Sequence, residues 1–162
     1  METMFFEKTA ELRRQKEELE KELNVKIKIL GRKVTFEGSA IEEYEAAIVL
    51  DAMSFGFSAK SALELRKEYM AFKKIHIRDF TRRKNLNDVR SRIIGKEGKT
   101  KRTLEEISNC EIIITESEVG IIGEAESMDS AIQAIISIVR GTKQSNAYRY
   151  LERINRTKKK IL

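Results

Sequence analysis

The chain has 162 residues, enough for one average domain or two small ones, and 41% of them are hydrophobic, enough for a folded core. Thirty-two Lys and Arg against 26 Asp and Glu leave a net charge of +6, a balance typical of proteins that bind a polyanion. The lone Cys110 and His76 are too few for an internal disulfide or a usual zinc site, and no apolar run approaches the ~20 residues that span a bilayer. We therefore expect a cytoplasmic protein without metal, cofactor or membrane partner.

The first part of the chain predicts two helices, two short strands and a more polar helix after them. Apolar residues at helical spacing indicate the helices, and alternating apolar and polar residues indicate the strands. The expected elements are a helix at 6–23, strands at 25–30 and 33–37, a helix at 41–55 and the polar helix at 58–72. We assign residues 1–56 to a first domain and 57–72 to a linker helix.

The second part predicts a more complete unit. Ile75 and Ile77 alternate with polar residues as in a strand, and Leu86, Val89 and Ile93 follow at helical spacing. The expected elements are strands at 73–80, 110–115 and 118–123 and helices at 85–94, 99–108 and 127–140. Their order is βααββα, and we assign 73–141 to this domain and 142–162 to a C-terminal basic helix.

A Gly-x-x-Gly loop joins the helix at 85–94 to the helix at 99–108. Because Gly95 and Gly98 lack a Cβ, they can adopt positive φ and let another backbone approach closely. The first amide N–H groups of the following helix lack intrahelical partners, and the positive end of the helix dipole favours an anion there. Such a loop is a device for clamping a nucleic-acid backbone, so we predict single-stranded RNA as the ligand.

Basic residues surround this loop and define the candidate site. The candidate RNA-binding residues are Arg92, Ile94, Gly95, Lys96, Glu97, Gly98, Lys99, Thr100, Lys101 and Arg102. The basic side chains of Arg92, Lys99, Lys101 and Arg102 are expected to supply charge near the phosphates. The bases are expected to face a shallow apolar groove between the two helices and the neighbouring strand, whose residues the sequence does not assign.

An internal repeat relates the two parts. A shift of 85 positions brings identical residues into register without a gap, among them Asn24 with Asn109 and Gly38 with Gly123. This register indicates two copies of one supersecondary unit. The first copy is expected to lack the opening strand and helix, to have only a two-stranded sheet, and to carry Ala10–Arg13 within a continuous helix where the glycine loop would stand. We therefore expect that it does not clamp RNA.

Residues 73–140 resemble a type I KH domain, and the loop segment Arg92–Arg102 resembles that of the archaeal and eukaryotic two-KH ribosome-assembly factors called partner of Nob. Further similarity lies in Phe55–Ser58 and Tyr148–Arg153. The resemblance implies an α+β fold of tandem KH-like units, three-stranded sheets with helices on one face, the N-terminal unit truncated and without its glycine loop. It also implies binding near the 3′ end of small-subunit rRNA during ribosome biogenesis. The implied protein partners are the Nob endonuclease and the alpha subunit of initiation factor two.

Two other functions remain open from the residues alone. A nuclease would need clustered carboxylates or a carboxylate beside a histidine, and the acidic pairs Glu17-Glu18, Glu42-Glu43 and Glu105-Glu106 stand instead at helical positions with basic or apolar neighbours. We therefore expect no catalytic residue. An adaptor function, in which the first domain recruits a nuclease or an initiation factor, is compatible with RNA binding.

Overall fold

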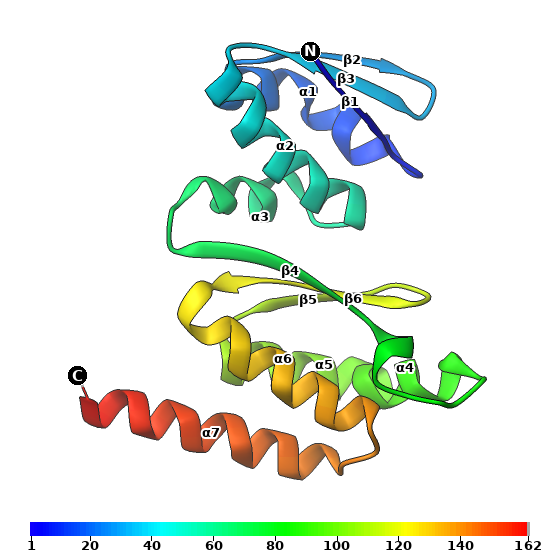
Figure 1. Cartoon of the computed structure of the whole chain (residues 1–162), viewed down its shortest axis with the longest axis vertical. Coiled ribbons are helices and arrows are strands. Elements are labelled where there is room, and N and C mark those ends of the chain that lie inside the picture. Colours follow the sequence, from blue (N-terminus) through cyan, green and yellow to red (C-terminus); the bar gives the residue numbers. More distant parts are fainter. Residues whose placement is uncertain (162) are drawn as a thin grey trace. The chain divides into compact units, whose positions relative to one another are not determined.

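The computed structural model describes residues 1–161, which form two compact units. The first unit is Met1–Glu68 and the second begins at Tyr69. Each unit contains one three-stranded antiparallel sheet together with helices, so the fold class is α+β as predicted (Figure 1). Within the described residues, no helix is both long and apolar enough to cross a membrane.

The second unit has the predicted order βααββα followed by one more helix. Its elements are β4 (Met70–His76), α4 (Leu86–Ile94), α5 (Lys99–Ser108), β5 (Glu111–Ile114), β6 (Glu118–Glu124), α6 (Ala125–Val139) and α7 (Gln144–Ile161). The strand order is β4-β6-β5, with both neighbouring pairs antiparallel. Helices α4, α5 and α6 lie on one face of this sheet (Figure 1). For the expected basic segment 142–162, residue 162 lies outside the described residues.

The core of the second unit lies between its sheet and these helices. The inner face of the sheet contributes Ile112 and Ile121, which lie opposite each other in the β5–β6 register. Helices α5 and α6 contribute Leu104 and Ile135. All four side chains are at most 1% exposed. Val89 and Ile93 of α4 belong to the same core, so its apolar contacts fix the positions of α4 and α5 on the sheet, and thereby the loop between these helices.

The first unit repeats this frame with one helix fewer. Its elements are β1 (Glu2–Phe5), α1 (Ala10–Leu23), β2 (Lys26–Leu30), β3 (Lys33–Glu37), α2 (Ala40–Phe55), α3 (Ala59–Leu63) and a 3₁₀ turn at Glu64–Arg66. The strand order β1-β3-β2 matches that of the second sheet. Ala10 is the first residue of α1, so a helix stands where the second unit has its glycine loop.

The prediction that the first unit lacks the opening strand, and so has only two strands, is wrong. Strand β1 pairs with β3 along its whole length, and Met4 lies opposite Val34 as Ile75 lies opposite Val119. Strand β1 is separated from its counterpart β4 by 71 positions in the sequence instead of 85. The difference arises because the first unit has no equivalent of α4 and its loop after the opening strand. An ungapped comparison therefore could not detect it. Pairing with β1 satisfies backbone groups that would otherwise leave an open edge on β3.

The helix expected at 58–72 is wrong in its second half. Helix α3 ends at Leu63, and after the 3₁₀ turn the chain enters β4 at Met70. Phe72 lies opposite Ile122 in the β4–β6 pair, so this segment belongs to the second sheet. Strand pairing with β6 thus outweighed the local helical pattern, as tertiary context commonly does for short segments.

The two copies share hydrogen bonds as well as topology. The Glu105 Oε2 atom accepts a hydrogen bond of 2.9 Å from the Ile112 N–H, and Glu20 Oε2 accepts one of the same length from the Ile27 N–H. In each unit a glutamate on a helix thereby accepts a hydrogen bond from a backbone N–H of the neighbouring edge strand. An edge strand has a neighbouring strand on one side only, and this hydrogen bond satisfies an N–H that has no strand partner.

We predict that Glu105→Ala destabilises the protein by about 1–2 kcal/mol, because the Ile112 N–H lies in a buried part of the edge strand and would lose its acceptor. Glu105→Gln keeps a side-chain carbonyl acceptor and should cost less. Urea denaturation of both variants measures the difference. Equal destabilisation by the two variants would show that the acceptor at this position is not what stabilises the strand.

Candidate nucleic-acid interface

The glycine loop turns the chain between α4 and α5 through three residues in the positive-φ region. Gly95 (φ 77°, ψ 174°) ends α4 and donates its N–H to the Ser91 carbonyl at 2.8 Å. Glu97 has φ 55°, and Gly98, with φ 75°, is the N-cap of α5. The Gly98 N–H donates to the Gly95 carbonyl at 3.2 Å and closes the turn. None of the loop residues Lys96–Gly98 is buried.

The two glycines are required for different physical reasons. A Cβ on Gly95 would lie 2.6 Å from the backbone nitrogen of Thr100 and would also overlap the Thr100 side chain. At Gly98 the nearest atom to an added Cβ is the Arg102 Nη1 at 3.4 Å, so a side chain there has room but must adopt positive φ. Gly95 therefore allows α5 to pack against the end of α4, whereas Gly98 allows the turn itself.

The first turn of α5 begins directly at this loop. No side chain caps the helix at Gly98, and the Lys99 N–H donates to the Lys96 carbonyl. The next amides of the helix thus lack a side-chain acceptor, in the position where the helix dipole is positive. Lys96 and Lys99 are both exposed beside them. Free donors and positive charge at one helix start form a site for phosphate oxygens.

Other candidate residues of the loop support its shape. Arg102 donates from Nη1 to the Glu97 carbonyl at 2.8 Å, which holds the exposed Glu97 in its positive-φ conformation. Thr100 was expected to contact RNA, but it is only 6% exposed and packs under Gly95. Lys101 forms an ion pair of 3.4 Å with Glu105, one turn along α5.

Arg92 was expected to supply charge near the phosphates, and its guanidinium is instead bound within the fold. Its Nη1 donates to the Ile138 carbonyl at 2.9 Å and its Nη2 to the Thr142 carbonyl at 2.7 Å. Arg92 therefore ties the end of α4 to the C-terminal end of α6. The sequence could not distinguish these roles because they depend on which face of α4 meets its neighbour.

A groove lies beside the loop, between α4 and the end of β5, whereas the sequence predicted one between the two helices and the neighbouring strand. It has a volume of about 380 Å³ and is lined by Asn87, Arg90, Ser91 and Ile94 from α4, by Ile114 at the end of β5, and by Thr115 and Glu116 just after that strand. Ile94 is 36% exposed, and Ile114 is half-buried. Arg90 donates from Nη1 to the Glu116 carbonyl at 3.2 Å and bridges the two walls. Ile94 at the helix end was the one signal for this groove in the sequence.

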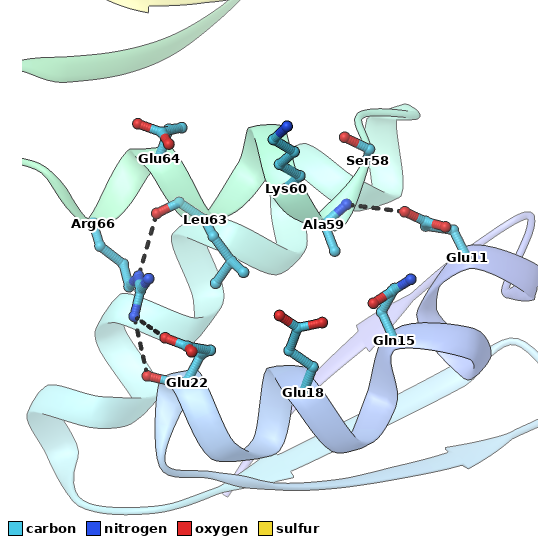
Figure 2. Close-up of a pocket in the computed structure, with 10 residues that line it drawn as sticks. All are labelled: Glu11, Gln15, Glu18, Glu22, Ser58, Ala59, Lys60, Leu63, Glu64 and Arg66. Atoms are coloured by element: carbon cyan, nitrogen blue, oxygen red, sulfur yellow. Dashed lines mark hydrogen bonds and ion pairs between the residues drawn. The ribbon is translucent and has the colours of Figure 1, made fainter.

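The first unit has a cleft of different character between α1 and α3. Figure 2 shows its lining residues, among which four are glutamates: Glu11, Glu18, Glu22 and Glu64. Glu11 accepts a hydrogen bond of 3.0 Å from the Ala59 N–H, and Arg66 lies 3.0 Å from the Glu22 carboxylate. A cleft with this many carboxylates repels phosphates. This cleft is therefore unsuited to phosphate binding.

The described part of the chain holds no group of three or more His, Cys, Asp or Glu side chains arranged to bind a metal ion. Cys110 is buried, and its burial raises the pKa of the thiol above the ordinary value. A thiol with a raised pKa is protonated near neutral pH and is a poor nucleophile. This cysteine therefore behaves as a small core residue.

The chain is similar to known proteins that contain KH domains. The family model for the second KH domain of PNO1, a eukaryotic type KH-domain (KH-domain type I), matches residues 71–156. A KH domain-containing protein from Methanocaldococcus jannaschii is 30% identical over 145 residues, which are 85% of this chain and 64% of that protein. The pre-rRNA-processing protein pno1 of Aspergillus fumigatus is 27% identical over 143 residues. The match covers 84% of this chain and 56% of the fungal protein.

Among solved structures, a similar one is the complex of Dim2p with a/eIF2alpha and rRNA from Pyrococcus horikoshii. The TM-score is 0.85 with 29% sequence identity, and the match covers 96% of this chain and 94% of that one. The likeness therefore extends over both units of the chain. In contrast, the chain spans only 64% and 56% of the length of the two curated relatives.

We predict that Gly95→Ala destabilises the protein by roughly 3 kcal/mol or more, because the added Cβ overlaps Thr100 in a backbone conformation that only glycine readily adopts. Gly98→Ala is the matched control and should cost about 1 kcal/mol, since only its positive φ is unfavourable. Thermal denaturation of the two variants measures the difference. A smaller loss for Gly95→Ala than for Gly98→Ala would contradict the close packing of α4 on α5.

Proposed function

Because this chain belongs to the PNO1 family of type I KH-domain proteins, we propose that it binds single-stranded RNA at the loop Gly95–Gly98 and in the groove beside it. The observation that carries the proposal is the exposed glycine turn at the uncapped start of α5, with Lys96 and Lys99 next to it. Of the predicted residues, these two lysines and the first amides of α5 contact phosphate. Arg102, Thr100 and Arg92 hold them in place.

RNA binding at this site divides into two kinds of contact. About four nucleotides run past the loop, and their phosphates interact with charge and main-chain donors that are blind to sequence. The bases lie over Ile94 and Ile114, which offer apolar surface. Asn87, Arg90 and Glu116 line the same groove and supply polar groups for base edges. Base preference therefore depends on the groove, and affinity depends on the loop.

The target that we propose is small-subunit rRNA near its 3′ end during ribosome biogenesis. Support comes from the fungal relative, which is a pre-rRNA-processing protein, and from Dim2p, whose solved complex contains rRNA. We further propose that the chain holds RNA without cleaving it. The carboxylates nearest the loop support this: Glu97 points from an exposed turn, and Glu105 is committed to Lys101 and the Ile112 N–H.

We predict that the double substitution Lys96→Asp with Glu97→Asp weakens RNA binding by at least tenfold while thermal stability stays unchanged, because a negative charge would then face the phosphate path. The matched control is Glu7→Asp with Lys8→Asp, an exposed pair of the same residue types in the first unit. Filter binding with a labelled fragment from the 3′ end of small-subunit rRNA measures affinity, and a denaturing gel shows that the RNA keeps its length. Unchanged affinity of the loop variant would refute the site, and shortened RNA would refute binding without cleavage.

A second candidate function, recruitment of a protein by the first unit, is favoured by exposed apolar side chains on α2. Ile41 is 74% exposed, Tyr44 is 71% exposed and Ile48 is 38% exposed, and their spacing of three and four places them on one face of the helix. Exposed apolar stripes on a folded domain are typical of protein contact sites. The partners we propose are the alpha subunit of initiation factor two, which occurs in the Dim2p complex, and the Nob endonuclease.

We predict that Ile41→Ser with Tyr44→Ser weakens binding of the initiation-factor alpha subunit by at least fivefold, because the apolar area buried on association is lost. Leu30→Ser is the control, since Leu30 is 80% exposed at the end of β2 and lies on another element. Isothermal titration calorimetry with the full chain measures both affinities. Equal binding by the wild type and the α2 variant would exclude this face as the contact site.

A further inference from the structure

Helix α7 lies along α5 and is anchored at its start and in its second half. Near its start, Gln144 donates from Nε2 to the Arg92 carbonyl at 3.4 Å, at the loop end of α4. Eleven residues later, Asn155 donates from Nδ2 to the Ile107 carbonyl at 2.8 Å, at the far end of α5. Ala147 and Leu151 are each 2% exposed and belong to the core of the second unit. Helix α7 is therefore a fixed part of this unit and lies beside α5 and α6 (Figure 1), with the face that carries Ala147 and Leu151 against the core.

The outward face of α7 carries one stripe of positive charge. Arg149, Arg153, Arg156 and Lys160 follow one another at steps of four, three and four residues and are all exposed. At 100° per residue this stripe lies opposite the buried seam of Ala147 and Leu151. None of the four forms an ion pair with another of the residues that the structure describes. Glu152 is the acidic residue of the helix.

The repeated fold does not require basic side chains at these positions. At the same offset of 85, Arg149 corresponds to Glu64 and Arg153 to Glu68 in the first unit. Glu64 belongs to the 3₁₀ turn that continues α3 and forms an ion pair with Lys67. At the position shared by Glu64 and Arg149 the two copies thus use opposite charge, whereas Glu68 lies in the turn that follows the 3₁₀ segment. Like charges at steps of three and four destabilise a helix, so the stripe on α7 works against the stability of the helix that carries it.

Positive charge also connects this stripe to the loop. Lys143 is exposed immediately before α7, and its neighbour Thr142 is held by the Arg92 guanidinium at the loop end of α4. The stripe from Arg149 to Lys160 then extends the charge by roughly 16 Å at the helical rise of about 1.5 Å per residue. A polyanion that leaves the loop on this side meets basic residues along the length of α7.

We propose that the outward face of α7 is a second RNA-binding surface, which holds the phosphates of RNA beyond the few nucleotides at the Gly95–Gly98 loop. The inference rests on the proposed function of that loop. The ligand is the phosphate backbone, offered either by the single strand that continues from the loop or by a neighbouring duplex. Arginine suits both, because its planar guanidinium binds phosphate through two N–H groups. The surface contributes affinity and length preference, and it contributes no base preference.

The test compares the full chain with the variant Arg149→Gln, Arg153→Gln, Arg156→Gln on three RNAs. The first is a single strand of six nucleotides, which fills the loop site alone. The second is a single strand of twenty nucleotides that contains the same six, and the third joins the six to a stable hairpin. We expect the variant to bind the six-nucleotide strand within twofold of the wild type. It should bind at least one of the two longer RNAs about tenfold more weakly. For three lost single-strand phosphate contacts, the slope of log K against log salt concentration should become shallower by about two.

The two longer RNAs distinguish the source of the phosphates. A loss of affinity for the twenty-nucleotide strand would show that α7 binds the single strand that continues from the loop. A loss of affinity for the hairpin RNA alone would show that it binds a duplex. Unchanged affinity for both longer RNAs would overturn the proposal. Thermal denaturation should show little change in stability, because the variant relieves repulsion along the helix and loses the contact of Arg153 with the Tyr150 ring.

Two controls separate this surface from net charge and from the loop. The variant Lys26→Gln, Lys28→Gln, Lys33→Gln removes the same number of charges from exposed positions on β2 and β3 of the first unit. An equal loss of RNA affinity in this control would overturn the proposal, since the effect would then come from the total charge of the protein. The loop variant Lys96→Asp with Glu97→Asp should lose affinity for all three RNAs. If it bound the six-nucleotide strand normally, the loop assignment would fail independently of the result for α7.

Discussion

The close contact between Gly95 and Thr100 is the constraint on which the RNA site depends. With no Cβ at Gly95, the first turn of α5 can pack against the last turn of α4, and the turn between them can remain short and exposed. The core places the two helices on the sheet, and this contact sets how their ends meet. Arg102 then holds Glu97 in a conformation that a residue with a side chain rarely adopts. The loop that we propose to bind phosphates depends on this geometry.

The two units show how one frame separates into two kinds of surface. Both have the same strand order, the same register between their last two strands, and a glutamate on the helix that accepts from the edge strand. They differ by the segment that contains α4 and its loop. Where that segment is present, the start of α5 lies beside the exposed Lys96 and Lys99. Where it is absent, α1 begins directly at Ala10, and the surface beside it is acidic.

Charge and apolar exposure divide between the units in the same way. The second unit presents Lys96 and Lys99 at its loop and an unneutralised arginine stripe on α7. The first unit presents Ile41 and Tyr44 on α2. Phosphates bind strongly to fixed positive charge, whereas protein partners bind strongly to exposed apolar area. The arrangement suits the proposed division, in which one unit holds RNA and the other binds a protein partner.

The sequence alone determined the repeat, the α+β class, the βααββα order and the position of the glycine loop, because these depend on local periodicity and on where glycine stands. Only the tertiary structure decided what pairing and packing determine. Strand β1 is recognised by its bonds to β3, since four residues carry almost no periodic signal. Arg92 and Lys99 are equally basic in sequence, and the difference between them arises because one faces the end of α6 and the other faces water. Side-chain roles on a helix depend on which neighbour each face meets, and long-range contacts set that choice.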